Sequence, residues 1–308
     1  MTDFAPEELL ADAIMRLIGD VRHVAVGNAS PIPALAALTL RERGGGKPYV
    51  SLLGSRRHMF FTDGGKELFD CAGQGRVDVF FLSGGEIDGE GNINLVGIGD
   101  HDRPSVRFPG SFGSAHLYYV VPKVILFRTE HSRRTLVPRV GFVSAPGTSP
   151  DNLYRPGGPI ALVTNRCVFG FDKARRRFRL DSVHPGQSIE DVIENTGFDF
   201  DRGGIVPQTA PPSPETLRIL RETVAPELAE VYPQFAATVF GSSARAWRAA
   251  LNRVIIGLII ATSLGFSEHD AAGRPPRLPG PDRRGGRCPD TRLRDPVRDA
   301  DARERGHC

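Results

Sequence analysis

Residues 23–40 read HVAVGNASPIPALAALTL, and their pattern indicates the fold class. Residues 23–27 form a short apolar run rich in valine, which is typical of a buried strand. Residues 28–31 supply polar capping groups and a proline, the usual start of a helix, and the apolar run 32–40 follows. A strand, a polar cap and a helix in this order form a βα unit, so the stretch predicts an α/β protein.

The segments on either side extend this pattern. Upstream, Pro6 opens a predicted amphipathic helix whose apolar residues recur at spacings of three and four up to Ile18. Downstream, short apolar runs predict further strands at 49–53, 77–82, 93–98, 123–127, 140–144, 160–164 and 178–180. Several of these runs are continuous rather than alternating, as in strands that are buried on both faces. We therefore expect an open mixed sheet flanked by helices.

The chain divides by composition into a domain at residues 1–245 and two further segments. Within the domain, Ser188 caps a predicted helix that Gly197 ends, and Ser213 precedes another. Residues 246–266 are predicted to form a short helical extension. Residues 267–308 carry ten arginines and six prolines with few large aliphatic side chains. Such a segment cannot bury enough apolar surface to offset its ordering entropy, so we predict a disordered tail.

The predicted tail has three interpretations. Two give it a function, in binding nucleic acid or a membrane, and the third does not. An arginine-rich arm is typical of binding to nucleic acid or membrane, but aspartates interrupt the arginines and no aromatic residue is available for stacking. The third interpretation is a frameshift or read-through product in place of native sequence. The whole chain has 39 Lys and Arg against 36 Asp and Glu, a balance that does not favour a nucleic-acid partner.

The sequence predicts a cytoplasmic protein that is not anchored in a membrane and holds no metal. The N-terminus lacks the basic and apolar regions of a signal peptide. The longest apolar run, 254–266, is shorter than the roughly 20 residues that span a bilayer. The four cysteines follow no metal-ligand spacing; they are Cys71, Cys167, Cys288 and Cys308.

Two glycine-rich segments are candidate sites for an oxyanion or a phosphate. Residues 81–94 read FLSGGEIDGEGNIN, and Gly84 and Gly85 follow a predicted strand, where glycine permits positive φ and leaves backbone N–H groups accessible. Residues 107–114 read RFPGSFGS, in which Gly110, Ser111 and Gly113 are predicted to form an anion nest. An ordinary turn or loop is the alternative for both segments.

Three motifs carry a family resemblance: FLSGGEIDGEGNINLVGIGDHDRPSVRFPGSFG at 81–113, RVGFVSAPG at 139–147 and IEDVIENTGFDFD at 189–201. In order and spacing they resemble β subunits of the class I CoA-transferase family, such as that of glutaconate CoA-transferase, over residues 7–240. The resemblance implies the CoA-transferase fold of the ribose-phosphate isomerase type. It also implies an α subunit as partner in an αβ or α2β2 complex and an acyl-CoA substrate, with no permanently bound cofactor.

The expected position of the family's nucleophile departs from the family pattern. The resemblance implies a catalytic glutamate near the end of the second strand, where this chain has Ser51, Leu52 and Leu53. No Asp or Glu occurs between Glu42 and Asp63. A serine hydroxyl cannot form the acyl anhydride through which CoA exchange proceeds, so the departure argues against glutamate-dependent CoA transfer.

Arg128 is the candidate for substrate binding. It ends a predicted buried strand, where a guanidinium can bind a substrate carboxylate through two hydrogen bonds. A salt bridge with Glu130 is the alternative. His58 and His131 are interpreted as structural side chains.

Within the family, the pattern is most similar to the β subunit of the actinobacterial cholesterol ring-cleaving hydrolase. That resemblance implies hydrolysis of a carbon–carbon bond in a ring of a steroid-derived acyl-CoA during cholesterol catabolism. It places the general base on the partner subunit and leaves oxyanion stabilisation to the backbone of Gly84, Gly85, Gly110 and Ser111. A genuine CoA-transferase of the glutaconate or 3-oxoacid type and a non-catalytic scaffold subunit are the alternatives.

Overall fold

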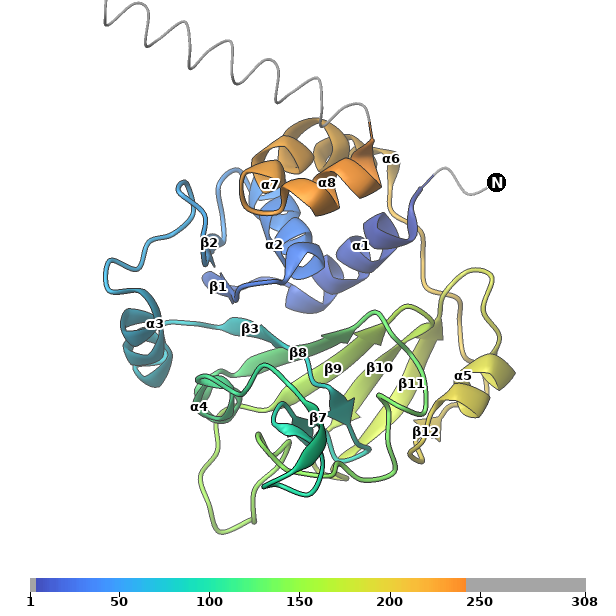
Figure 1. The fold of residues 1–308 in the computed structure, drawn as a ribbon. Coiled ribbons are helices and arrows are strands. Elements are labelled where there is room, and N and C mark those ends of the chain that lie inside the picture. Colours follow the sequence, from blue (N-terminus) through green and yellow to red (C-terminus); the bar gives the residue numbers. More distant parts are fainter. Residues whose placement is uncertain (1–3, 242–308) are drawn as a thin grey trace, which may run out of the picture. The chain divides into compact units, whose positions relative to one another are not determined.

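The computed structural model describes residues 4–241, all within one compact unit of the chain (Figure 1). The predictions for 246–266 and 267–308 fall outside the described residues. An eight-stranded sheet organises the unit in the order β12-β11-β10-β9-β8-β3-β1-β2. Its strands are β1 His23–Val26, β2 Tyr49–Leu52, β3 Val79–Leu82, β8 Lys123–Arg128, β9 Pro159–Thr164, β10 Cys167–Asp172, β11 Arg177–Val183 and β12 Asp201–Arg202.

The sheet is mixed, as predicted. Strands β2, β1, β3, β8 and β9 are parallel neighbours, β10 is antiparallel to β9 and β11, and β12 is parallel to β11. The sequence pattern did not predict β10, because Gly170 interrupts its apolar run. That glycine has a packing reason: a Cβ there would lie 2.3 Å from a carboxylate oxygen of Asp181 on β11.

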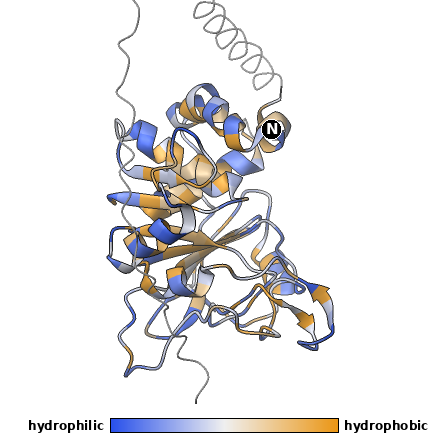
Figure 2. Ribbon diagram, turned by 60° about the vertical axis from the view of Figure 1, so that its left-hand side comes forward, coloured by the Kyte–Doolittle hydropathy of each residue, from blue (hydrophilic) through white to orange (hydrophobic). Residues whose placement is uncertain are grey.

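Helices cover both faces of the sheet. One face packs against α1 Pro6–Ile18, α2 Pro31–Arg43 and the continuous helical segment α6 Pro214–Arg218, η1 Ile219–Val224 and α7 Ala225–Val231, which α8 Pro233–Phe240 follows. The other face packs against α3 Gly64–Gly73, α4 Ser114–Val120 and α5 Ile189–Asn195. Side chains of β1 alternate between the faces, since Val24 and Val26 join the first core and Ala25 the second. The strands at the centre of the sheet are accordingly mostly hydrophobic in Figure 2, as burial on both faces requires, whereas β11 and β12 carry charged residues.

Two strand predictions were wrong. The run 93–98 is not one strand but parts of two small antiparallel sheets, β4 Glu86–Ile87 with β5 Ile93–Asn94 and β6 Gly97–Gly99 with β7 Pro104–Arg107. The run 140–144 forms no strand. Its first two N–H groups are bound by side chains, because Val140 donates to Asp88 (3.3 Å) and Gly141 donates to Glu86 (2.8 Å).

The predicted cap of α5 gives a stability test. Ser188 Oγ accepts from the Asp191 N–H (3.0 Å), and the Asp191 carboxylate accepts from the Ser188 N–H (3.1 Å). Ser188→Ala is expected to lower the free energy of unfolding by about 1 kcal/mol, because the first turn loses this partner. Urea unfolding measures the change. The exposed Ser105→Ala serves as control, and equal losses in both variants would contradict a capping effect.

Candidate functional site

The carboxyl ends of five parallel strands meet at one edge of the sheet. The chain passes from β1 to β2 on one side and then returns to β3 on the other, so the strand order reverses between β1 and β3. Ligands of open α/β sheets bind outside the carboxyl ends at such a switch point. Since β2, β3 and β8 all end at this edge, the predicted site residues at 51–53, 84–85 and 128 belong to the same edge.

The three residues at the expected nucleophile position are buried or partly buried. Ser51 has no exposed surface, and Leu52 (1% exposed) belongs to the core beneath α1 and α2. Leu53 packs against the opposite core. Ser51 Oγ lies 2.8 Å from Nε2 of His23 on β1. The sequence offered no signal for His23, because its proximity to Ser51 depends on the pairing of β1 with β2.

The segment after β2 folds back and is tied to α7. Leu52 donates its N–H to the carbonyl of His58 (2.8 Å), and His58 Nε2 lies 3.1 Å from a carboxylate oxygen of Glu227. The hydrogen bond from His58 lowers the pKa of Glu227. The Arg56 N–H donates to Glu230 (3.0 Å). His58 is 6% exposed, in agreement with a structural role.

The expectation for Gly84 and Gly85 was wrong in the sign of φ and in one of its two donors, while the Gly84 N–H has no partner among the described residues. Neither has positive φ, and the Gly85 N–H is not free, since it donates to the carbonyl of Asn94 (2.9 Å). Close packing explains the pair instead. A Cβ on Gly84 would lie 2.4 Å from Ile93, and one on Gly85 would lie 2.2 Å from the ring of Phe108.

The loop at Gly110, Ser111 and Gly113 retains some of the free N–H donors that were predicted to form an anion nest. Gly110 has φ +101 and donates its N–H to the carbonyl of Leu95 (2.9 Å), so it is not a free donor. Within residues 4–241 no partner accepts from the N–H groups of Ser111 or Gly113. Gly113 immediately precedes α4, and a Cβ on it would clash with the ring of Phe69 at 2.1 Å.

Arg128 ends β8 at the carboxyl edge and forms the ion pair named as its alternative role. Its Nη2 donates to Glu130 (3.2 Å), and the side chain is 31% exposed. Glu130 also accepts from Arg134 (2.7 Å), and that hydrogen bond is the main cause of the lowered pKa of Glu130. The Nε of Arg128 is buried and has no hydrogen-bond partner among the described residues. The ion pair with Glu130 therefore leaves this donor of the guanidinium unpaired in the described part of the chain.

His131 is buried between two threonines. Its Nδ1 and Nε2 each lie 2.8 Å from a hydroxyl, that of Thr164 and that of Thr196 respectively. Burial and then the charge of Arg166 lower the pKa of His131 to about 4. The ring is neutral near pH 7 and fully partnered, in agreement with a structural role.

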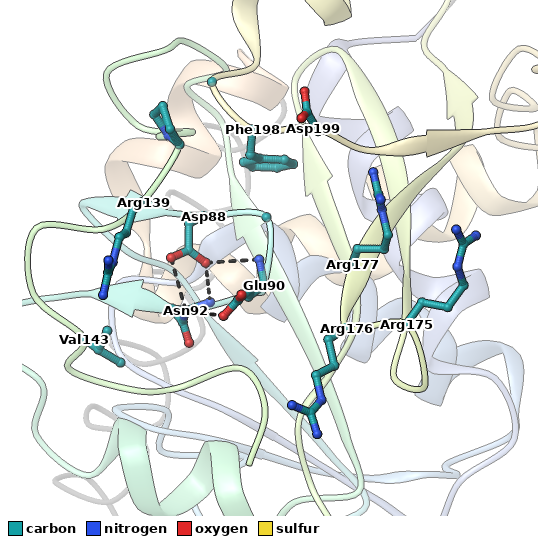
Figure 3. Close-up of a pocket in the computed structure, with 13 residues that line it drawn as sticks. Asp88, Glu90, Asn92, Arg139, Val143, Arg175, Arg176, Arg177, Phe198 and Asp199 are labelled. Carbon is teal, nitrogen blue, oxygen red and sulfur yellow. Dashed lines mark hydrogen bonds between the residues drawn. The ribbon is translucent and has the colours of Figure 1, made fainter. Parts of the chain in front are cut away.

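A cavity of about 840 Å³ lies away from these residues, beside the turn that follows β10 (Figure 3). Because β10 is antiparallel to β9, this turn lies at the amino edge of the parallel strands. The cavity is lined by four arginines, Arg139, Arg175, Arg176 and Arg177, and by the acidic turn at Asp88 and Glu90. Asp201 pairs with two of the arginines and Asp151 with a third, which leaves little uncompensated positive charge.

Within residues 4–241, no group of three His, Cys, Asp or Glu side chains could hold a metal ion. No helix of this described part has the length and apolar character needed to cross a membrane.

Comparison with known proteins defines the class of this open α/β domain. Residues 46–195 match the family described as Coenzyme A transferase. The B-type subunit of the 3-oxoadipate CoA-transferase of Pseudomonas knackmussii is 35% identical over 153 residues, covering 48% of this chain and 58% of that protein. The cholesterol ring-cleaving hydrolase IpdB subunit of Rhodococcus jostii is 30% identical over 171 residues, covering 52% of this chain and 64% of that protein.

This chain is also similar to a solved structure over most of its length. The decarboxylase AibA/AibB superposes with a TM-score of 0.61 at 27% identity and covers 78% of this chain and 100% of that chain. Residues 46–195 of the present chain belong to the coenzyme A transferase family. Its matches span about three fifths of the length of the curated relatives.

Proposed function

We propose that this chain is the β subunit of a heteromeric hydrolase that opens a ring of a steroid-derived acyl-CoA by breaking a carbon–carbon bond. The observation that carries the proposal is the side chain at the end of β2. Ser51 is a neutral hydroxyl bound to His23, and the described residues place no carboxylate on this strand that could form an acyl anhydride. An acyl-CoA is the substrate, an α subunit completes the site, and no resident cofactor takes part.

The relatives support bond cleavage as the chemistry. One is named a cholesterol ring-cleaving hydrolase and a solved neighbour is named a decarboxylase, and both names describe the breaking of a carbon–carbon bond. Such a reaction leaves a carbanion that must be held as an enolate, so it needs a proton donor and acceptor and a positioned oxyanion partner. The unpartnered N–H groups of Ser111 and Gly113 are candidates for the last role.

A genuine CoA-transferase is the second candidate, because the relative from the 3-oxoadipate enzyme has the higher identity, 35% against 30%. This activity requires a nucleophilic carboxylate from outside β2. A non-catalytic scaffold subunit is the third candidate.

The test uses the complex purified with its α subunit. Cyclic keto-acyl-CoAs are supplied in ¹⁸O-labelled water, and the proposed hydrolase is expected to place one label in the newly formed carboxylate while the thioester stays intact. Exchange of CoA between two carboxylic acids, with a borohydride-reducible thioester on either subunit, would establish the transferase. The chain alone is the control, and turnover by it would contradict a site completed by the α subunit.

Arg128 provides a residue-level prediction for the same complex. Arg128→Ala is expected to lower kcat/KM for a carboxylate-bearing acyl-CoA about tenfold to a hundredfold, because a charged hydrogen bond contributes roughly 1.5–3 kcal/mol. Steady-state kinetics measure the loss. Arg134→Ala is the matched control, since Arg134 also donates to Glu130 but is 78% exposed. Equal losses in the two variants, or none for Arg128→Ala, would contradict substrate binding by Arg128.

A further inference from the structure

His23 and Ser51 form a hydrogen-bonded pair on neighbouring parallel strands. The register pairs His23 with Tyr49 and Ala25 with Ser51, which brings the two side chains to the same face of the sheet. Ser51 Oγ lies 2.8 Å from His23 Nε2, and this is the only hydrogen bond of the hydroxyl among the described residues. Ser51 lies one residue before β2 ends at the carboxyl edge, whereas His23 is the first residue of β1.

The direction of the proton in this pair follows from the other ring nitrogen. His23 Nδ1 lies 3.0 Å from the carbonyl oxygen of Arg76. A carbonyl oxygen only accepts, so Nδ1 must carry the hydrogen. In the neutral ring Nε2 then has a lone pair, and the Ser51 hydroxyl donates to it. This is the arrangement in which a histidine takes a proton from an attacking serine.

The surroundings keep the imidazole neutral and oriented. Burial lowers the pKa of His23, although the hydrogen bond to Arg76 and the charge of Asp78 act in the opposite direction. The ring of Phe61, 7% exposed, packs beside the imidazole with 6.1 Å between the centroids. A neutral, fixed histidine is ready to accept a proton near pH 7.

Ser51 has no exposed surface, and the chain's own segment 53–61 lies beside the end of β2 and His23. This segment folds back, since the His58 carbonyl accepts from the Leu52 N–H and Phe61 packs beside His23. It contains turns but neither helix nor strand, and its ties to α7 are polar contacts with Glu227 and Glu230. Leu53 and Met59 of this segment also pack against the apolar core and Phe61 belongs to it, so exposure of Ser51 requires these apolar contacts to be broken together with the polar ones.

We propose that Ser51 is a nucleophile with His23 as its general base, exposed when segment 53–61 is displaced in the assembled complex. The proposal rests on the proposed hydrolysis. Ser51 Oγ bonds to the ring-ketone carbon of the acyl-CoA, and its proton moves to His23 Nε2. The adjacent carbon–carbon bond breaks, its electron pair leaves as an enolate, and that carbon takes the proton from His23. An ester of Ser51 remains.

Water completes the cycle. It gives a proton to His23 Nε2 and adds to the ester carbonyl; the ester C–O bond then breaks and Ser51 Oγ recovers the proton. The product is a carboxylic acid with one oxygen from water, and no oxidant or further reactant is needed.

The experiment compares wild-type complex with Ser51→Ala, Ser51→Cys and His23→Gln, using cyclic keto-acyl-CoAs. Ser51→Ala is expected to lower kcat about a thousandfold or more, and His23→Gln about a hundredfold. Acid quenching during turnover followed by peptide mass spectrometry is expected to show an acyl adduct on Ser51 in the wild type and a longer-lived thioester in Ser51→Cys. Ser182→Ala is the control, since the Ser182 hydroxyl is partly buried and, like that of Ser51, is hydrogen-bonded, in this case to Thr209 (2.7 Å).

The outcomes separate the two proposals. A wild-type complex that hydrolyses no keto-acyl-CoA contradicts the proposed function itself. Turnover within threefold of wild type in an assembled Ser51→Ala complex, or absence of any adduct in both wild type and Ser51→Cys, overturns the nucleophile while leaving hydrolysis intact. If Ser51→Ala fails to assemble, the adduct measurements on wild type and Ser51→Cys decide.

Discussion

Phe169→Ala is expected to lower the free energy of unfolding by about 3–5 kcal/mol, the range for truncating a buried aromatic side chain. Phe169 lies on β10 and has no exposed surface. Its ring packs against three other phenylalanines, with centroid distances of 6.0 Å to Phe178, 6.1 Å to Phe198 and 5.0 Å to Phe200. Alanine leaves a cavity that these neighbours can fill only in part, because Phe178 is held on β11 and Phe198 and Phe200 lie in the segment between α5 and β12.

Urea unfolding at constant pH measures this change as a shift in the midpoint of the unfolding transition, with the slope of the transition unchanged. Phe112→Ala is the control, since Phe112 is 83% exposed and is expected to change stability by less than about 1 kcal/mol. A loss below about 1 kcal/mol for Phe169→Ala would show that the aromatic cluster does not form the centre of this core.

Acidification is expected to destabilise the fold through His131. Its pKa is about 4 in the folded chain and 6.5 in the unfolded chain, so the unfolded state binds the proton more strongly. The stabilisation is complete above pH 6.5 and is lost as the pH falls through 4. The difference corresponds to roughly 3 kcal/mol for this 4%-exposed side chain. His184 and His23, whose pKa values are also lowered by burial, contribute with the same sign.

Unfolding of wild type and His131→Gln at pH 7.5 and pH 4 isolates this contribution. The variant is expected to be less stable than wild type at pH 7.5, because two hydrogen bonds are disturbed. On acidification to pH 4, its free energy of unfolding is expected to fall by about 3 kcal/mol less than that of wild type. His116→Gln, at an exposed position, is expected to keep the wild-type pH dependence. An unchanged pH dependence in His131→Gln would mean that His131 is not buried neutral in the folded chain.

The parts of the fold that were predictable are those whose pattern is local. A proline start and apolar spacing indicated α1 and α2, and Ser188 indicated the start of α5. The strand predictions failed where a side chain distant in the sequence, and not a neighbouring residue, determined the local structure. Carboxylates of the β4–β5 hairpin bind the N–H groups at 140–141, and Asp181 explains the glycine that hid β10.

The features of the candidate site also divide into those that the local sequence predicted and those that depend on distant residues. The pairing of Arg128 with Glu130 was foreseeable because they are two positions apart, and the missing carboxylate near Ser51 is visible in the residue types alone. The positive φ expected at Gly84 and Gly85 and the free N–H expected at Gly85 were wrong, since residue type shows that a Cβ is absent but not which neighbour needs the space.

Residue types and their local order thus established the α/β class, the family motifs and the loss of an acid at the end of β2. Only the folded chain joined His23 to Ser51, 28 positions apart, and His58 to Glu227, 169 positions apart. The physical reason is that parallel strands are connected through a helix, so the register that sets their neighbouring side chains comes from packing of both sheet faces and not from any local turn.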